Sequence, residues 1–105
     1  MAQKTDIINL VRSFCREVDK NNKIKIRKAY LFGSMARGKS NKYSDIDIAI
    51  VSDSFSGFKY QDRAMLNPYI LRINTSFEIH PFTKNEFNSN TPFVKEIKKT
   101  GIRIY

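Results

Sequence analysis

The stretch YLFGSMARGKSNKYSDIDIAIV, residues 30–51, holds the strongest structural signal in the chain. An apolar run stops at Gly33-Ser34, a polar loop follows, and the residues from Asp45 onward alternate in a way that predicts a β-strand. Side chains two residues apart in a strand point to the same face, so Asp45 and Asp47 face one way and the intervening isoleucines the other. An acidic pair in such an apolar strand needs a partner that compensates its charge.

The two aspartates suit a divalent cation. Their backbone positions lie roughly 7 Å apart and their carboxylates can converge, which brings like charges together. Oxygen ligands of this kind suit Mg²⁺, which usually takes one or two carboxylates and completes its shell with water and phosphate oxygens. In the alternative interpretation, Asp45 caps a turn and Asp47 faces water at a sheet edge.

The turn that precedes the aspartates is a candidate phosphate site. Gly33 lets the backbone approach a ligand closely, and the amides of a following helical turn could bind phosphate oxygens together with the Ser34 hydroxyl. Arg37, one turn further on, could add a positive charge at a phosphate. Taken alone, Gly33 and Ser34 also fit an ordinary strand-ending turn, and Arg37 fits a surface charge.

A third carboxylate, Glu78, lies between Phe77 and Ile79 in another apolar run. If this run is a strand beside that of Asp47, three inward carboxylates face one phosphate loop, which makes a two-metal site for nucleotidyl transfer. The alternative is that Glu78 is a strand residue facing solvent.

The rest of the chain predicts one small α+β domain over residues 1–105, a two-layer arrangement with helices packed on a small mixed sheet. Thr83 and Glu86 form a capping box. Asn67-Pro68 should break or kink the helix expected over residues 58–66, and residues 69–73 could either continue this helix or form a strand. We expect strands over residues 24–32, 45–51, 75–82 and 102–105, and helices over residues 5–19, 58–66, 84–87 and 91–99.

The composition limits the partners. Lys and Arg number 19 and Asp and Glu number 10, a net charge of +9 at pH 7, which favours a nucleotide, a nucleic acid or an acidic protein face. No apolar run approaches the ~20 residues of a membrane-spanning helix, and no signal peptide is evident. We therefore expect a cytoplasmic protein with no membrane partner. The single cysteine, Cys15, fits a reducing compartment and a place in the core.

The motifs together resemble a known family. Gly33-Ser34, ten further residues and then Asp45-x-Asp47 are similar to the signature of the DNA polymerase β-type nucleotidyltransferase superfamily. The residues FEI at positions 77–79 are similar to the third element of that superfamily. The short chain and the segments LFGSMARG and SDIDI most resemble the minimal nucleotidyltransferases of bacteria and archaea.

The resemblance implies a polymerase β-type core and a Mg²⁺-dependent transfer of AMP from ATP to a hydroxyl group. Asp45 and Asp47 would hold two Mg²⁺ ions, and Glu78 would be the third catalytic and metal-binding residue, at the attacking hydroxyl. Ser34 and the backbone at Gly33 would bind the β- and γ-phosphates.

The resemblance also suggests a partner. Minimal nucleotidyltransferases are often encoded beside a helical HEPN protein, an RNase toxin, and can inactivate it by transferring AMP to a tyrosine. We therefore expect an antitoxin of a type VII-like pair with a HEPN-type partner. Two alternatives stay open: a contact-only antitoxin without catalysis, and a nucleotidyltransferase that modifies a small molecule or an RNA end. The net charge would suit RNA, and a homo-oligomer also stays open.

Two features have no assigned role. His80, the single histidine, follows the third predicted strand and could touch a nucleotide or a metal, although a hydrogen-bonded surface or core histidine is commoner. Residues 60–75 could contain an adenine or partner contact, and no pattern in them identifies one.

Overall fold

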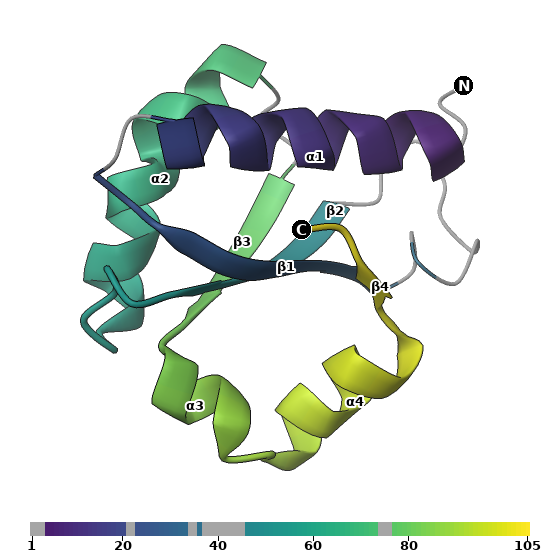
Figure 1. Ribbon diagram of the computed structural model, residues 1–105, viewed down its shortest axis with the longest axis vertical. Helices are drawn as coiled ribbons and strands as arrows, with labels where there is room; N and C mark the ends of the chain where they lie inside the picture. Colours follow the sequence, from purple (N-terminus) through teal and green to yellow (C-terminus); the bar gives the residue numbers. More distant parts are fainter. Residues whose placement is uncertain (1–3, 21–22, 34–35, 37–45, 74–76) are drawn as a thin grey trace.

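In the described part of the chain, four strands form one mixed sheet with helices on it (Figure 1). The computed structural model describes residues 4–20, 23–33, 36, 46–73 and 77–105, so the helical turn expected after Gly33 lies outside the described residues. The elements are, in chain order, α1 (Lys4–Lys20), β1 (Ile26–Phe32), β2 (Ile46–Ser52), α2 (Lys59–Ile73), β3 (Phe77–Phe82), α3 (Lys84–Asn88), α4 (Pro92–Thr100) and β4 (Ile102–Arg103).

The strands lie in the order β3-β2-β1-β4. β1 is antiparallel to both of its neighbours, whereas β2 and β3 are parallel and are joined by the crossover helix α2. The predicted α+β class with a small mixed sheet is confirmed. Because β1 is antiparallel to β2 and β3, the C-terminal end of β1 and the N-terminal ends of β2 and β3 lie at the same end of the strands.

Helices cover both faces of the sheet, which adds a short helical layer to the two layers expected. α1 and α2 lie on one face and α3 and α4 on the other (Figure 1). Strand alternation divides the apolar residues accordingly. The larger core cluster, on the α1 and α2 side, includes Phe14, Leu31, Ile48, Leu66 and Ile79. The smaller cluster, on the α3 and α4 side, includes Phe32, Ala49, Val51, Phe82, Phe87, Val94 and Ile97.

Helix α2 continues through Pro68, so of the predicted break or kink at this residue the break is wrong. A proline inside a helix removes the hydrogen bond to the carbonyl four residues earlier, here that of Ala64. Ala64 and Pro68 are both exposed, so water can bind that carbonyl. The helix expected over residues 58–66 is confirmed, and it extends to Ile73 as part of α2 (Lys59–Ile73). Tyr60 and Leu71 are among its exposed apolar side chains.

The last helices begin and end as the sequence predicts. The Thr83 hydroxyl accepts a hydrogen bond from the Glu86 amide at 3.1 Å, and the Glu86 carboxylate accepts one from the Thr83 amide at 2.9 Å. This is the expected capping box at the start of α3. α4 has Pro92 at its first position and Gly101 just past its end, and the chain then pairs with β1 as β4.

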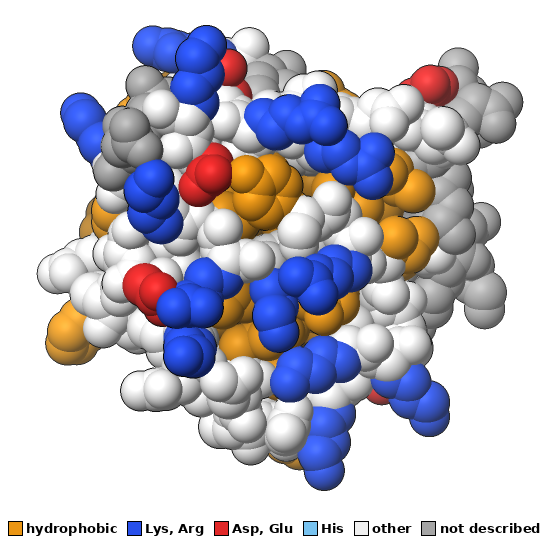
Figure 2. All heavy atoms as spheres, viewed as in Figure 1, with side chains coloured by type: hydrophobic (Ala, Val, Ile, Leu, Met, Phe, Trp, Pro, Cys, Tyr) orange, Lys and Arg blue, Asp and Glu red, His pale blue; other side chains and the backbone are white. Residues whose placement is uncertain are grey.

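The surface reflects the charge of +9. Figure 2 shows Lys and Arg side chains across the viewed face, with fewer acidic side chains and with apolar areas between them. Among the described helices, none combines the length and the apolar character that crossing a lipid bilayer requires.

Candidate active site

The turn after β1 lies directly against β2. Phe32, the last residue of β1, pairs with Asp47 of β2. Gly33 follows with a φ of +75°, a conformation that side-chain-bearing residues rarely adopt. A Cβ atom at this position would also collide with Oδ2 of Asp47. The backbone can approach the carboxylate only because residue 33 is glycine. Ser34 and Arg37, the other candidate nucleotide-binding residues, lie outside the described residues.

The structure brings two of the three candidate carboxylates together. Asp47 of β2 and Glu78 of β3 are direct partners in the parallel pair. Partners in neighbouring strands point to the same face, here the α3 and α4 side. Glu78 is exposed, and the Asp47 side chain is 29% exposed, so both carboxylates are accessible to a ligand. Asp45, the third candidate, lies outside the described residues.

His80 belongs to this group, although the sequence alone assigned it no role. Its Nε2 atom lies 3.3 Å from Oδ1 of Asp47. Its ring packs edge to face with Phe32 and Phe93, with ring centroids 5.0 and 5.8 Å apart. The signal that could have found it is the alternation of β3, which places His80 on the same face as Glu78.

The donor set fits magnesium. Carboxylate oxygens are its preferred protein ligands, and Asp47 and Glu78 supply them from adjacent strands. The space at Gly33, which a Cβ atom would fill, leaves the Asp47 carboxylate accessible from the turn. In residues 46–73 and 77–105 and the other described ranges, no group of three or more potential ligands occurs. Asp45, the further ligand that the sequence predicts, is not among these residues.

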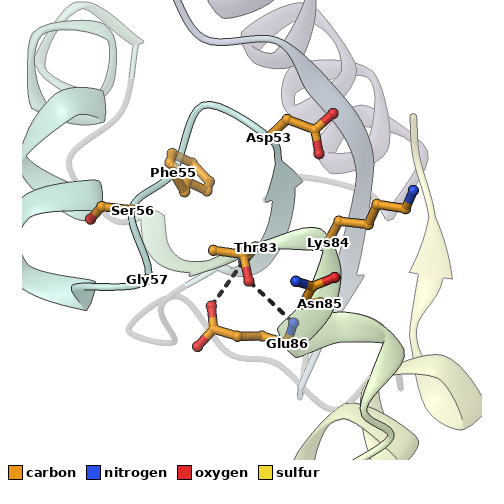
Figure 3. Close-up of a pocket in the computed structure, with 8 residues that line it drawn as sticks. All are labelled: Asp53, Phe55, Ser56, Gly57, Thr83, Lys84, Asn85 and Glu86. Atoms are coloured by element: carbon orange, nitrogen blue, oxygen red, sulfur yellow. Dashed lines mark hydrogen bonds between the residues drawn. The ribbon is translucent and has the colours of Figure 1, made fainter.

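The hollow shown in Figure 3 lies at the opposite end of the strands. It measures about 520 Å³ and is formed by the segment after β2 and the start of α3. Several of its polar groups already have partners: Thr83 and Glu86 form the capping box, and Asp53 pairs with Arg27, which lies outside the lining, at 2.6 Å. Because Asp47 and Glu78 lie near the other ends of β2 and β3, this hollow is not part of the candidate site.

The groups with clearly shifted pKa values lie away from the candidate site. The pKa of the Asp19 carboxyl is lowered, first by a hydrogen bond from the Ile26 amide and then by one from the Tyr105 hydroxyl. The same contact with Asp19 raises the pKa of Tyr105. Burial, aided by Asp19, raises the pKa of Cys15 to about 12. This cluster joins α1 to β1 and to the C-terminus and is structural.

Paired carboxylates beside a glycine turn are an arrangement that can hold metal ions for phosphoryl or nucleotidyl transfer. Residues 14–105 match the family model described as polymerase beta, nucleotidyltransferase, so the chain belongs to this family and is a nucleotidyltransferase. The resemblance inferred from the motifs is thereby confirmed.

Known proteins with similar sequences or folds agree with this assignment. A protein of Methanocaldococcus jannaschii, MJ0141, named as a candidate protein adenylyltransferase, is 23% identical over 94% of this chain and 99% of its own length. A crystal structure of a candidate nucleotidyltransferase from Sulfolobus solfataricus superposes with a TM-score of 0.69 at 21% identity, over 97% of this chain and 82% of that one.

A third relative is part of a complex. A crystal structure of a toxin–antitoxin with AMP-PNP superposes with a TM-score of 0.60 at 19% identity, over 90% of this chain and 72% of that one. At this level of identity the two superpositions show a shared fold.

Proposed function

We propose that this chain transfers AMP from ATP to a hydroxyl group of a protein, with Asp45, Asp47 and Glu78 as ligands of two Mg²⁺ ions. The observation that carries the proposal is the pairing of Asp47 with Glu78 across parallel strands, next to the turn at Gly33. Asp45 is included because the sequence motif places it two residues before Asp47. Ser34 and Arg37 are included on the same ground, as residues that bind the nucleotide.

The reaction forms one bond and breaks one. The acceptor hydroxyl oxygen bonds to the α-phosphorus of ATP while the bond from that phosphorus to the bridging oxygen breaks, and pyrophosphate leaves. Mg²⁺ bound here would neutralise charge on the entering and leaving oxygens. Glu78, exposed beside Asp47, receives the hydroxyl proton. The backbone at Gly33 would bind the β- and γ-phosphates, as the motif resemblance implies.

The acceptor we favour is a tyrosine of a HEPN-type toxin, which makes this chain an antitoxin. Three findings support this choice: the motif resemblance to minimal nucleotidyltransferases, the name of the Methanocaldococcus jannaschii relative, and the fold shared with a toxin–antitoxin. The charge of +9 would suit an acidic partner face.

Calorimetric titration of ATP tests the metal–nucleotide site. We expect the wild-type protein to bind ATP only with Mg²⁺, and the double variant Asp45→Asn, Asp47→Asn to lose this binding. The matched control is Asp53→Asn, which also removes carboxylate charge from the β2 strand region, but at its other end. Wild-type binding that does not depend on Mg²⁺, or that survives in the double variant, would contradict the proposal.

A transfer assay then tests the acceptor. ATP labelled at the α-phosphate is incubated with the protein and candidate HEPN-type proteins, and tyrosine labelling is located by mass spectrometry. Label on a small molecule or an RNA end instead would replace the proposed acceptor while keeping the enzyme class. If the double variant Asp45→Asn, Asp47→Asn still neutralises the toxin, contact between the two proteins is sufficient for neutralisation and AMP transfer is not needed.

A further inference from the structure

We propose that His80 is a positioning residue, which holds Oδ1 of Asp47 so that Oδ2 is presented to the ligand at the turn of Gly33. The inference rests on the metal–nucleotide site proposed above and assigns a role within it to a residue outside the sequence motif. It starts from the 3.3 Å contact between His80 Nε2 and Asp47 Oδ1.

The chemistry of the two groups fixes the direction of this hydrogen bond. An ionised carboxylate only accepts hydrogen bonds, so the hydrogen must be on Nε2 of His80. The bond engages one oxygen of Asp47, while the other oxygen is the atom nearest to the missing Cβ of Gly33. A hydrogen bond to one oxygen restricts rotation of the carboxylate and so sets the direction in which the other oxygen points.

The imidazole is itself held in place. Phe32 lies against it from β1 and Phe93 lies against it from α4, with ring centroids 5.0 and 5.8 Å away. The His80 side chain is only 23% exposed. Two rings from different elements therefore restrict the imidazole, and a rigid donor positions its acceptor better than a mobile one.

Packing alone does not account for a histidine here. Apart from the Asp47 contact, the side chains packed on the imidazole are the apolar rings of Phe32 and Phe93. A phenylalanine would serve such a cluster without the cost of burying ring nitrogens. The feature that histidine adds is the N–H directed at Asp47.

Three variants separate the hydrogen bond from the packing. His80→Phe keeps an aromatic ring against Phe32 and Phe93 but removes the donor. His80→Gln keeps an amide N–H at a similar reach and removes the ring. Tyr30→Phe is the matched control, because it removes a polar atom from a ring that packs on Phe87 in the same apolar cluster.

Titration of ATP with Mg²⁺ is the main measurement. We expect His80→Phe to weaken Mg²⁺-dependent ATP binding by about 10–100-fold, the usual cost of losing a hydrogen bond to a metal ligand. His80→Gln should restore most of the affinity, and Tyr30→Phe should leave it unchanged. Wild-type affinity in His80→Phe, or equal losses in His80→Phe and His80→Gln, overturns the positioning role.

A second measurement in metal-free protein separates the two proposals. Thermal unfolding of His80→Phe, Asp47→Asn and the double variant should give non-additive shifts in Tm if the side chains interact. Additive shifts overturn the positioning role, whatever the nucleotide data show. If wild-type protein does not bind ATP with Mg²⁺, the proposed function fails and the presentation of Oδ2 to a ligand fails with it. Wild-type binding together with an unchanged His80→Phe rejects the positioning role alone.

Discussion

The carboxylate of Asp47 occupies the space in which a side chain on Gly33 would begin. The two residues belong to different parts of the motif, and the antiparallel pairing of Phe32 with Asp47 brings them together. The glycine thus serves the site in two ways, because it adopts a φ of +75° and leaves room for a carboxylate.

Replacement of Gly33 by alanine should therefore impair nucleotide binding as well as stability. Gly57→Ala is the matched control, because Gly57 also has a positive φ, +96°, but its nearest potential contact is a Thr83 methyl group at 3.9 Å. Both variants should lose about 1–3 kcal/mol of unfolding free energy from backbone strain. Only Gly33→Ala should weaken Mg²⁺-dependent ATP binding, measured by calorimetry. Equal ATP affinities in the two variants would show that the Asp47 carboxylate can move away from residue 33 without weakening ATP binding.

Asp62 is a buried carboxylate that holds the loop between β2 and α2. It is 1% exposed and accepts hydrogen bonds from the Ser56 amide at 2.7 Å, the Ser56 hydroxyl at 2.9 Å and the Gly57 amide at 2.9 Å. In Asp62→Asn, the new amide group must face one of these donors, so we expect a loss of about 1–3 kcal/mol in urea unfolding. Asp53→Asn, which removes only an exposed ion pair, should cost less than about 1 kcal/mol. A similar loss in both variants would argue against this network.

The hydrogen bonds that Asp19 accepts from the Ile26 amide and the Tyr105 hydroxyl should make stability depend on pH at both extremes. The pKa of Asp19 is lowered from 3.8, so its contribution is present above that value and is lost as pH falls through the lower folded value. The pKa of Tyr105 is raised from 10.0, so its contribution is present below that value and is lost as pH rises through the higher folded value.

Urea unfolding across the pH range tests this assignment. Asp19→Asn should reduce the loss of stability in acid, and Tyr105→Phe should reduce the loss in alkali. Glu96→Gln, an exposed substitution on α4, is the control and should leave both limbs of the curve unchanged. An acid limb in Asp19→Asn as steep as that of the wild type would contradict the assigned role of this carboxylate.

Cys15 should be inert in the folded protein. Its side chain has no exposed surface, and burial followed by repulsion from Asp19 raises its pKa to about 12. Since the thiolate is the reactive form, a disulfide reagent at about pH 8 should modify Cys15 only when urea unfolds the chain. Ser13→Cys, at an exposed position on the same helix, should react without urea. Rapid labelling of wild-type protein without urea would show that α1 opens readily.

The candidate site divides into a part that was readable from the sequence and a part that was not. The alternation in β2 identified Asp47, and the apolar run around Glu78 identified β3, because both signals are local. The contact of His80 with Asp47 was not predicted, because it joins residues 33 positions apart and depends on the pairing of neighbouring strands. The helix break predicted at Pro68 is wrong, because the prediction used only the low helix propensity of proline. It did not consider that this face of the helix is exposed, where water can bind the carbonyl left without a hydrogen bond.

The sequence by itself determined the class of fold, the helices and strands apart from the second half of α2, the capping box at Thr83 and the motif that defines the family. Each of these follows from the periodicity or spacing of residues within a short stretch of sequence, so it can be recognised without knowing which distant segments pack together. The tertiary structure decided that β2 and β3 pair in parallel with Asp47 beside Glu78, that Gly33 makes room for Asp47, and that His80 is held between two aromatic rings. These relationships depend on strand pairing and register between distant segments, and the packing of both sheet faces selects that register.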